Sequence, residues 1–342
     1  MNWIHVLLSA MLLVGCGASA GKEQGATAVK PQDAVVAVEP VVVVPNFNAD
    51  SAYNFIEAQL NFGPRVPSTA SHRKCGDFLI SKFQSYGATV IAQEFDLRAY
   101  NGDVLNARNI IAQFQPEKQQ RIMLCAHWDT RPWADSDPDK ANHYKPLPGA
   151  NDGGSGVGVL LEIARQLAAV PSNVGVDVVL FDAEDYGLHE NDSHLWSKHR
   201  HSWALGSQYW SINPHKAEYT AMYGILLDIV GAPNSQFLYE GYSTRFAEEV
   251  VYKVWQCAEK LGYGKFFINE DGGVITDDHY YVNGIRGIPC IDIINCDPES
   301  PNGFGPYHHT MKDDMDWIDK TTLKAVGQTV LTVIYNEKQW LQ

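Results

Sequence analysis

Residues 176–187 read VDVVLFDAEDYG, an apolar run that ends abruptly in three carboxylates. The apolar residues 178–181 favour a strand that is buried on both faces of a parallel sheet. Open α/β sheets bind ligands at the carboxyl ends of their strands, so Asp182, Glu184 and Asp185 would lie where a site can form. One of two adjacent acids can bind a metal while the other transfers protons. Taken alone, the pair could equally be part of a solvated, acid-rich loop.

Length and composition limit what kind of protein the sequence encodes. The 342 residues suit one α/β domain, and 45% of them are hydrophobic, which is ample for a large core. The formal net charge is −14, from 40 acidic and 26 basic side chains. This excess of negative charge argues against nucleic-acid and anionic-membrane partners.

The N-terminal segment is expected to lie outside the fold. Residues 3–14 are apolar but too few to span a bilayer as a stable helix. They lead into LVGC, ending at Cys16, which resembles the lipobox of bacterial lipoproteins. The resemblance implies cleavage before Cys16, a lipid anchor on that cysteine, and export to the periplasmic side of the inner or outer membrane. The leading MNWIH lacks the Lys or Arg of a usual signal, and an ordinary secretory signal is the alternative.

A tether is expected between this signal and the fold. Residues 17–45 are rich in small residues and proline, and they show neither a helical nor an alternating period. The predicted organisation is therefore a signal segment at 1–16, a flexible tether at 17–45 and a single domain at 46–342.

Helical and strand patterns alternate through this domain. The first helix is expected to be capped by Asp50-Ser51 and stopped by Gly63-Pro64. Further helices are expected at 71–86, 153–169, 243–261 and 322–340, and strands at 89–97, 104–114, 121–126, 176–181, 221–230 and 288–294. The alternation predicts a three-layer α/β/α sandwich with a central mixed sheet, mostly parallel in its middle.

Acids and histidines follow several of these strands. The candidates are His127, Asp129, Asp152, Glu184, Asp185, Asp228, Asp277, Asp278, His279 and His309. Each has an ordinary explanation by itself; Asp152 before two glycines, for example, is a common helix N-cap. Together they offer hard oxygen and nitrogen ligands at separate strand ends. Catalytic zinc needs three such ligands and a nearby carboxylate that is free to move protons.

Three motifs identify a family. They are LLDIVGAPN at 226–234, GGVITDDH at 272–279 and HHTMKDD at 308–314. Together with the order of the acids, they resemble the zinc aminopeptidase clan and, within it, the animal-type glutaminyl cyclases and their bacterial relatives. The similarity runs from about residue 46 to the C-terminus. It implies a zinc-dependent catalytic domain.

The resemblance also implies a metal centre and a proton carrier. A single zinc per chain would be held by Asp152, Asp185 and His309. Glu184 would be the general acid and base of the reaction. Asp228 and Asp277 would form a hydrogen-bonded chain of carboxylates with Glu184, with a shared proton and raised pKa values.

The same resemblance places the substrate pocket. Phe304 stands where cyclases keep an aromatic residue, and Ile275 matches an apolar pocket position. The family tryptophan that follows the acidic pair falls near Glu190 in this chain, so Trp196 or Trp203 would take its place. We assign Trp196 to substrate binding.

The chain departs from the family pattern at three further points. Asp185 stands where Glu is usual, so the metal must lie about one methylene closer to the backbone. His308 replaces the tryptophan before the zinc histidine. No second cysteine matches the animal disulfide that begins at the position of Cys125.

The resemblance implies a glutaminyl-peptide cyclotransferase that acts on peptides and proteins with an N-terminal glutamine. We expect the protein to be a monomer. The alternative is a di-zinc aminopeptidase, in which His127 and Asp228 hold a second metal bridged by Asp152 while Glu184 activates water. A third interpretation is a lipoprotein that keeps the fold for binding alone.

Overall fold

The computed structural model describes residues 43–297, 300 and 302–338. The signal segment, Cys16 and residues 17–42 of the tether lie outside the described residues. Among the described helices, none has the length and apolar character needed to cross a membrane.

Within the described residues, the centre of the domain is a six-stranded sheet in the order β1-β2-β4-β3-β5-β8. Its strands are β1 (Thr89–Arg98), β2 (Val104–Phe114), β3 (Arg121–His127), β4 (Gly175–Phe181), β5 (Tyr223–Asp228) and β8 (Cys290–Ile294). The pairs β4-β3, β3-β5 and β5-β8 are parallel, whereas β1-β2 and β2-β4 are antiparallel. The predicted mixed sheet with a parallel centre is confirmed.

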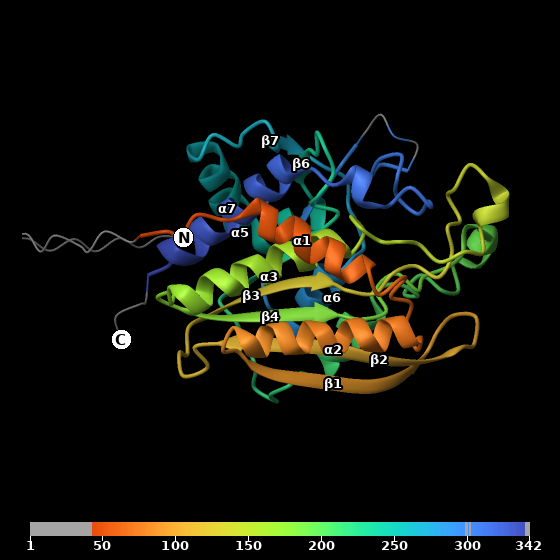
Figure 1. The fold of residues 1–342 in the computed structure, drawn as a ribbon, viewed down its shortest axis with the longest axis horizontal. Coiled ribbons are helices and arrows are strands. Elements are labelled where there is room, and N and C mark those ends of the chain that lie inside the picture. Colours follow the sequence, from red (N-terminus) through yellow and green to blue (C-terminus); the bar gives the residue numbers. More distant parts are fainter. Residues whose placement is uncertain (1–42, 298–299, 301, 339–342) are drawn as a thin grey trace, which may run out of the picture. The chain divides into compact units, whose positions relative to one another are not determined.

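Helices cover both faces of this sheet (Figure 1). They are α1 (Ala49–Leu60), α2 (Ala70–Ser85), α3 (Gly154–Ala169), α4 (Leu205–Ile212), α5 (Gly241–Lys260), α6 (Asp278–Tyr281) and α7 (Lys320–Asn336). Short turns of other helix types lie at Lys140–Asn142, Glu190–Leu195, Val282–Arg286 and Met315–Trp317. Strands β6 (Phe237–Tyr239) and β7 (Phe267–Asp271) form a separate parallel pair.

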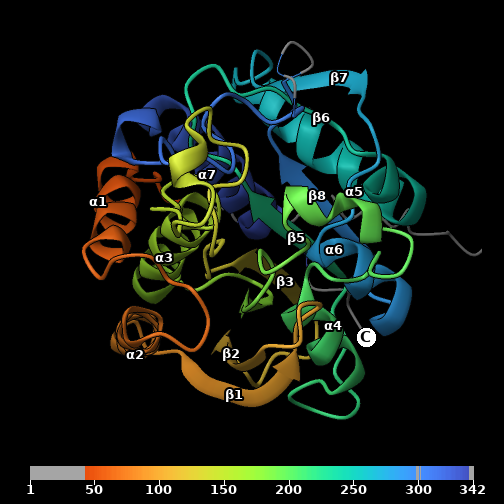
Figure 2. The same cartoon turned by 90° about the vertical axis from the view of Figure 1, so that its right-hand side faces the viewer.

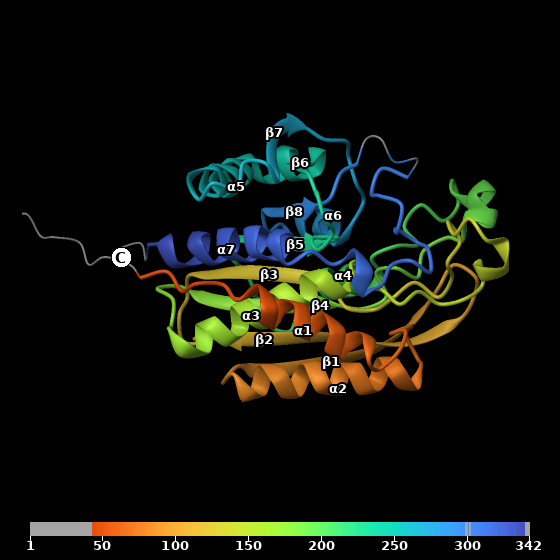
Figure 3. The ribbon, with the colours of Figure 1, turned by 45° about the horizontal axis from the view of Figure 1, so that its top comes forward.

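Alternate residues of the strands divide the core into two hydrophobic layers. Leu124 of β3 belongs to a hydrophobic cluster that includes residues of α1, α2, α3, α5 and α7. Its neighbours Met123 and Cys125 belong to a second cluster, with Trp210 of α4 and Val282. This alternation follows from the two-residue period of a strand. Figures 2 and 3 show the two helical layers on either side of the sheet. The fold is the predicted three-layer α/β/α sandwich.

Strand register brings the predicted site residues to one edge. In the parallel centre, His127 at the end of β3 pairs with Phe181 at the end of β4. Asp228 at the end of β5 pairs with Ile294 at the end of β8. The loops that leave these strand ends gather at the right-hand side of Figure 1 and face the viewer in Figure 2.

Local details differ from the sequence-based expectations. The N-cap of α1 is Asn48, whose side chain accepts a hydrogen bond from the amide of Ser51, so the predicted Asp50-Ser51 cap is wrong. Asn and Asp cap helices almost equally well, and the first turn contains both. Helices α4 and α6 and the β6-β7 pair were not anticipated, because each is too short to show a periodic pattern.

Helix α3 approaches the sheet closely near the site. A Cβ atom added to Gly156 would lie 2.2 Å from the backbone carbonyl oxygen of Leu227 on β5. Backbone cannot move aside as a flexible side chain can, so only glycine permits this separation. The contact fixes the start of α3, and with it Asp152, against the end of β5.

Replacing Gly156 by Ala should therefore destabilise the domain by about 1–3 kcal/mol, the usual cost of overpacking a core. Chemical denaturation would measure the loss. Gly284→Ala is the matched control, since no atom lies within 4 Å of a Cβ added there. Equal stability of the two variants would contradict this role of Gly156.

Candidate active site

The turn after β4 is held by a buried carboxylate. Asp129 is fully buried, and its two oxygens accept hydrogen bonds from the amides of Glu184 at 3.0 Å and Asp185 at 3.2 Å. Ala183, one residue earlier, adopts a φ of 53°. Asp129, a candidate ligand by sequence, thus positions the backbone of the acidic pair.

A second buried carboxylate holds the segment before α3 in the same way. Asp313 accepts hydrogen bonds from the amides of Asn151 at 2.7 Å and Asp152 at 3.1 Å. Burial and the neighbouring Asp152 raise the pKa of Asp313. Asp313 belongs to the HHTMKDD motif, so this motif supplies both the anchor for Asp152 and the nearby His309.

Every predicted zinc, acid–base and substrate residue lines one cavity of about 430 Å³. Its lining consists of Asp152, Glu184, Asp185, Trp196, Trp203, Asp228, Ile229, Val274, Ile275, Thr276, Asp277, Ile294, Phe304, His308 and His309. The acids lie at one end of the strands, and apolar and aromatic side chains complete the wall. A cavity with an apolar wall and a few convergent polar groups is typical of a ligand site.

The predicted zinc ligands suit a metal ion. His309 Nε2 lies 3.2 Å from Asp185 Oδ1 and 3.6 Å from Asp152 Oδ2. Both Asp185 oxygens and Asp152 Oδ2 are buried and have no hydrogen-bond partner among the residues that the structure describes. Burial lowers the pKa of His309 to about 4, so its imidazole is neutral, the form that binds metals. Burial and Asp152 raise the pKa of Asp185, a repulsion that a cation would relieve.

His308, next in sequence, belongs to the same cluster. The two imidazoles stack with their centres 3.7 Å apart, and His308 Nε2 lies 3.8 Å from Asp152 Oδ2. Asp152, His308 and His309 each offer a ligand atom within 4.8 Å of the others. Asp185 is not a member of this group, although its carboxylate reaches His309, so its place as the third ligand stays a prediction.

His127 forms a second group with the same aspartate. Its Nε2 atom lies 3.1 Å from both Asp152 Oδ1 and Asp228 Oδ1. Although burial alone would lower it, contacts with these acids raise the pKa of His127 well above its usual value. The imidazole thus lies between two carboxylates, a place where it can either carry a proton or bind a second metal.

The carboxyl groups of the cavity influence one another. Burial and the nearby Asp277 raise the pKa of Glu184 well above its usual value. Burial also raises the pKa of Asp228 to about 7, against the opposing effect of His127. The hydrogen bond that Asp228 makes goes to His127, and Asp277 Oδ1 caps α6, so a direct chain from these two acids to Glu184 stays a prediction.

Three residues at the cavity have left-handed backbone conformations that are uncommon outside glycine. They are Ala183 before Glu184, Ile229 after Asp228, and His309 itself, with φ values of 53°, 49° and 54°. Each such residue costs roughly 1–3 kcal/mol, and such strain concentrates at functional sites. The strained residues therefore lie in the same three turns as the proposed site residues Glu184, Asp228 and His309.

The sequence left Trp196 and Trp203 as alternatives for the pocket wall. Both of them line the cavity. Trp203 lies parallel to the His309 ring at 5.8 Å, and the Arg131 guanidinium lies 4.6 Å from its centre. Trp196 is 51% exposed and stands at the mouth. The role of Arg131 was not predicted from the sequence. Its Nη1 atom donates a hydrogen bond to the carbonyl oxygen of Asp185 at 3.1 Å and so supports the turn that contains Glu184 and Asp185.

Asp278 and His279 of the TDDH motif point away from the cavity into the core. His279 Nε2 lies 2.9 Å from Glu240 Oε2, and its Nδ1 lies 3.7 Å from Asp292 Oδ2. Glu240 also caps α5 through the amides of Tyr242 and Ser243. These residues form a buried support behind Asp277.

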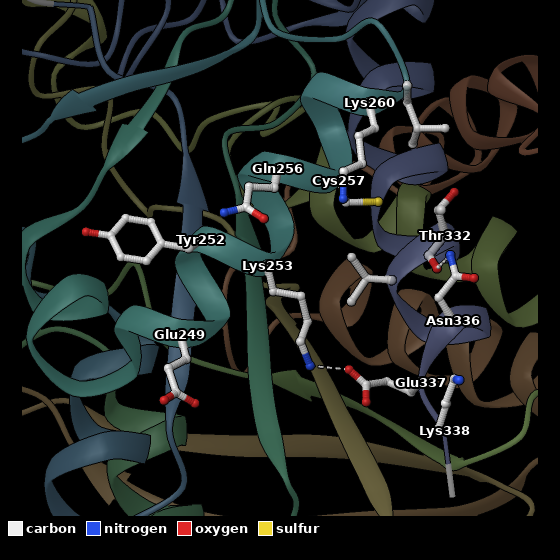
Figure 4. A pocket seen from close by; sticks show the side chains of 12 residues that line it. Glu249, Tyr252, Lys253, Gln256, Cys257, Lys260, Thr332, Asn336, Glu337 and Lys338 are labelled. Carbon is white, nitrogen blue, oxygen red and sulfur yellow. Dashed lines mark hydrogen bonds and ion pairs between the residues drawn. The ribbon is translucent and has the colours of Figure 1, made fainter.

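A larger cavity, of about 780 Å³, lies between α5 and α7 (Figure 4). Its lining includes the ion pair of Lys253 with Glu337 and the half-buried Cys257. It contains none of the clustered acids and histidines found among the described residues at the strand ends. Size alone therefore does not identify the site; chemistry does.

Comparisons with known proteins find a matching family and similar solved structures. Residues 109–334 match peptidase family M28. The chain is 56% identical to a Zn-dependent exopeptidase from Parabacteroides distasonis, with a TM-score of 0.84, covering 86% of this chain and 100% of that one. It is 55% identical to the glutaminyl cyclase of Tannerella forsythia, again with a TM-score of 0.84 and coverage of 86% and 100%.

Curated relatives are more distant and longer. The chain is 28% identical to aminopeptidase YwaD of Bacillus subtilis over 237 residues, which are 67% of this chain and 44% of that protein. The chain thus spans less than half the length of this relative.

The raised pKa of Asp228 predicts how stability depends on pH. In the folded protein this carboxyl binds its proton up to about pH 7, whereas in the unfolded chain it releases it near pH 4. Its contribution to stability is therefore present below about pH 4 and is lost as the pH rises to about 7. In Asp228→Asn, which cannot ionise, stability should fall less over this range.

Thermal unfolding of the chelator-treated protein at pH 5 and pH 8 would measure the difference. Asp316→Asn, at an exposed acid for which no such burial exists, is the control. An equal loss of stability in wild type and Asp228→Asn would show that Asp228 is not the group responsible.

Proposed function

Because the chain belongs to peptidase family M28, we propose that it is a zinc-dependent glutaminyl-peptide cyclotransferase. Such an enzyme converts the N-terminal glutamine of peptides and proteins to pyroglutamate and releases ammonia. The observation that carries the proposal is the cavity in which Glu184 lies beside Asp152, Asp185 and His309. The 55% identity to the Tannerella forsythia glutaminyl cyclase supports the choice of reaction within the family.

One zinc ion per chain is proposed, held by Asp152, Asp185 and His309. When bound, it would supply Lewis acidity that polarises the side-chain amide of the substrate glutamine. Unpartnered carboxylate oxygens and a neutral imidazole support this ligand set.

Glu184 is the proton carrier in this proposal. Its raised pKa brings it closer to the working pH of a general acid and base. Glu184 takes a proton from the substrate α-amine, whose nitrogen then attacks the side-chain amide carbon and closes a five-membered lactam. The carbon–nitrogen bond of the amide breaks, and Glu184 returns the proton to the departing ammonia. The negative charges of the neighbouring Asp228 and Asp277 favour the protonated form of Glu184.

The apolar wall holds the glutamine side chain. Ile275 and Phe304 line the cavity, and Trp196 stands at its mouth. These residues grip the aliphatic stem and leave the remaining peptide outside. The cavity volume of about 430 Å³ is large enough for one glutamine residue.

A di-zinc aminopeptidase is the second candidate, and one observation favours it. His127, Asp152 and Asp228 also offer ligand atoms within 4.8 Å of one another. The cyclase is favoured by the 55% identity to the Tannerella forsythia glutaminyl cyclase, which is matched over its whole length. We therefore prefer the cyclase with one ion.

We further propose that the protein is an exported lipoprotein, anchored by a lipid on Cys16 at the periplasmic side of a membrane, and that it acts as a monomer. The LVGC segment supports the anchor. Detection of a labelled fatty acid on the wild-type protein, and its loss in Cys16→Ala, would test it.

Replacing Glu184 by Gln should lower the rate of ammonia release from Gln-peptides by about 10²–10⁴-fold, because the amide cannot carry the proton. Zinc content should not change, since the ligands remain. Glu190→Gln, at an exposed acid in the loop that follows, is the control. Full activity of Glu184→Gln would remove this residue from the mechanism.

Metal analysis separates the two candidate functions. Wild type should contain one zinc per chain, His309→Ala should contain none, and His127→Ala should keep one. Two ions in wild type, one of them lost in His127→Ala, together with release of free amino acids from aminoacyl anilides, would establish the aminopeptidase instead. Circular dichroism would verify that each variant is folded.

A further inference from the structure

A second, smaller pocket adjoins the proposed catalytic cavity. It has a volume of about 310 Å³ and is lined by Trp196, Arg200, His201, Tyr242, Thr276 and Tyr280. Trp196 and Thr276 belong to the walls of both. A peptide whose first residue occupies the catalytic cavity can therefore pass directly into this pocket.

The two cavities differ in their charged side chains. Asp152, Glu184, Asp185, Asp228 and Asp277 line the catalytic cavity. Among the described residues, the adjoining pocket has no acidic side chain, and Arg200 contributes a permanent positive charge. In a chain with a net charge of −14, this is a local reversal of sign.

The loop that supplies Arg200 is basic over a long stretch. Residues 193–217 contain Lys198, Arg200 and several histidines but no Asp or Glu. The same loop supplies Trp196 and Trp203 to the catalytic cavity. Its basic charge is thus built into the segment that forms the substrate-facing wall.

The pocket has firmly held walls. His201 Nδ1 lies 3.0 Å from the hydroxyl of Tyr281, and the side-chain amide of Gln208 donates to the carbonyl oxygens of His201 and Trp203. On the opposite side, the rings of Tyr242 from α5 and Tyr280 from α6 are 4.7 Å apart. These contacts organise the pocket before a ligand arrives.

We propose that this pocket is a subsite for the second or third residue of the substrate and that it selects peptides with an Asp or Glu there. The inference rests on the proposed cyclase function. An extended peptide advances about 3.3 Å per residue, so one of these two side chains reaches a pocket that shares its wall with the first. Arg200 offsets the repulsion that the cavity carboxylates exert on an acidic substrate, and the tyrosine rings pack on its aliphatic stem.

The test compares ammonia release from amidated peptides Gln-X-Ala and Gln-Ala-X, in which X is Glu, Gln or Lys. The C-terminal amide removes the one other carboxylate that could bind Arg200. For wild type, kcat/KM should be about three- to tenfold higher with Glu than with Lys in one series, mainly through KM, as for an exposed charge pair. The preference should weaken in 1 M salt, where the Debye length is about 3 Å.

Arg200→Glu should abolish or invert this preference, a ratio that is measured within one variant and therefore does not depend on its overall rate. Lys74→Glu is the charge-matched control, because Lys74 is exposed on α2 and should keep the wild-type preference. A Glu-to-Lys ratio that is the same in wild type and Arg200→Glu would overturn the subsite. Ammonia release from no peptide at all would instead overturn the proposed cyclase function.

Discussion

The active site depends on the hydrogen bonds that the buried carboxylate of Asp129 accepts from two successive amides, those of Glu184 and Asp185. Buried amides need acceptors, and here one side chain satisfies both. The turn can then follow β4 without further strand pairing, with Ala183 left-handed. Two adjacent acids are thereby fixed in different surroundings, so that one can face His309 while the other keeps its proton.

Burying so many carboxylates is costly unless positive charge compensates them. The described part of the chain supplies some of this charge: His127 lies between Asp152 and Asp228, and Arg131 supports the backbone of Asp185. Within residues 43–297, 300 and 302–338, the oxygens of Asp185 still have no hydrogen-bond partner. A metal there would complete the site and stabilise the fold at once, because binding to the folded state alone adds to its stability.

Strand periodicity and the position of acids at strand ends predicted the fold and the location of the site, because both follow from local patterns. The supporting contacts could not be predicted. Asp129 was a candidate ligand and Asp313 was only part of the HHTMKDD motif, and it is the tertiary structure that shows both accepting hydrogen bonds from backbone amides. Likewise the sequence left Trp196 and Trp203 as alternatives, whereas both line the cavity, since the long loop returns to it twice.

The close packing of that loop against the turn that contains Glu184 and Asp185 depends on one glycine. Gly187 ends the VDVVLFDAEDYG stretch, and a Cβ atom on it would lie 2.0 Å from the Trp203 ring. The absence of a side chain at Gly187 therefore lets Trp203 pack against this turn. The acids of the proposed active site thus lie at the strand ends, while the loop packed on them supplies aromatic wall residues and the basic charge. Catalysis and specificity are then separable: the loop can change its charge without moving the acids, provided that Gly187 and Trp203 keep their contact.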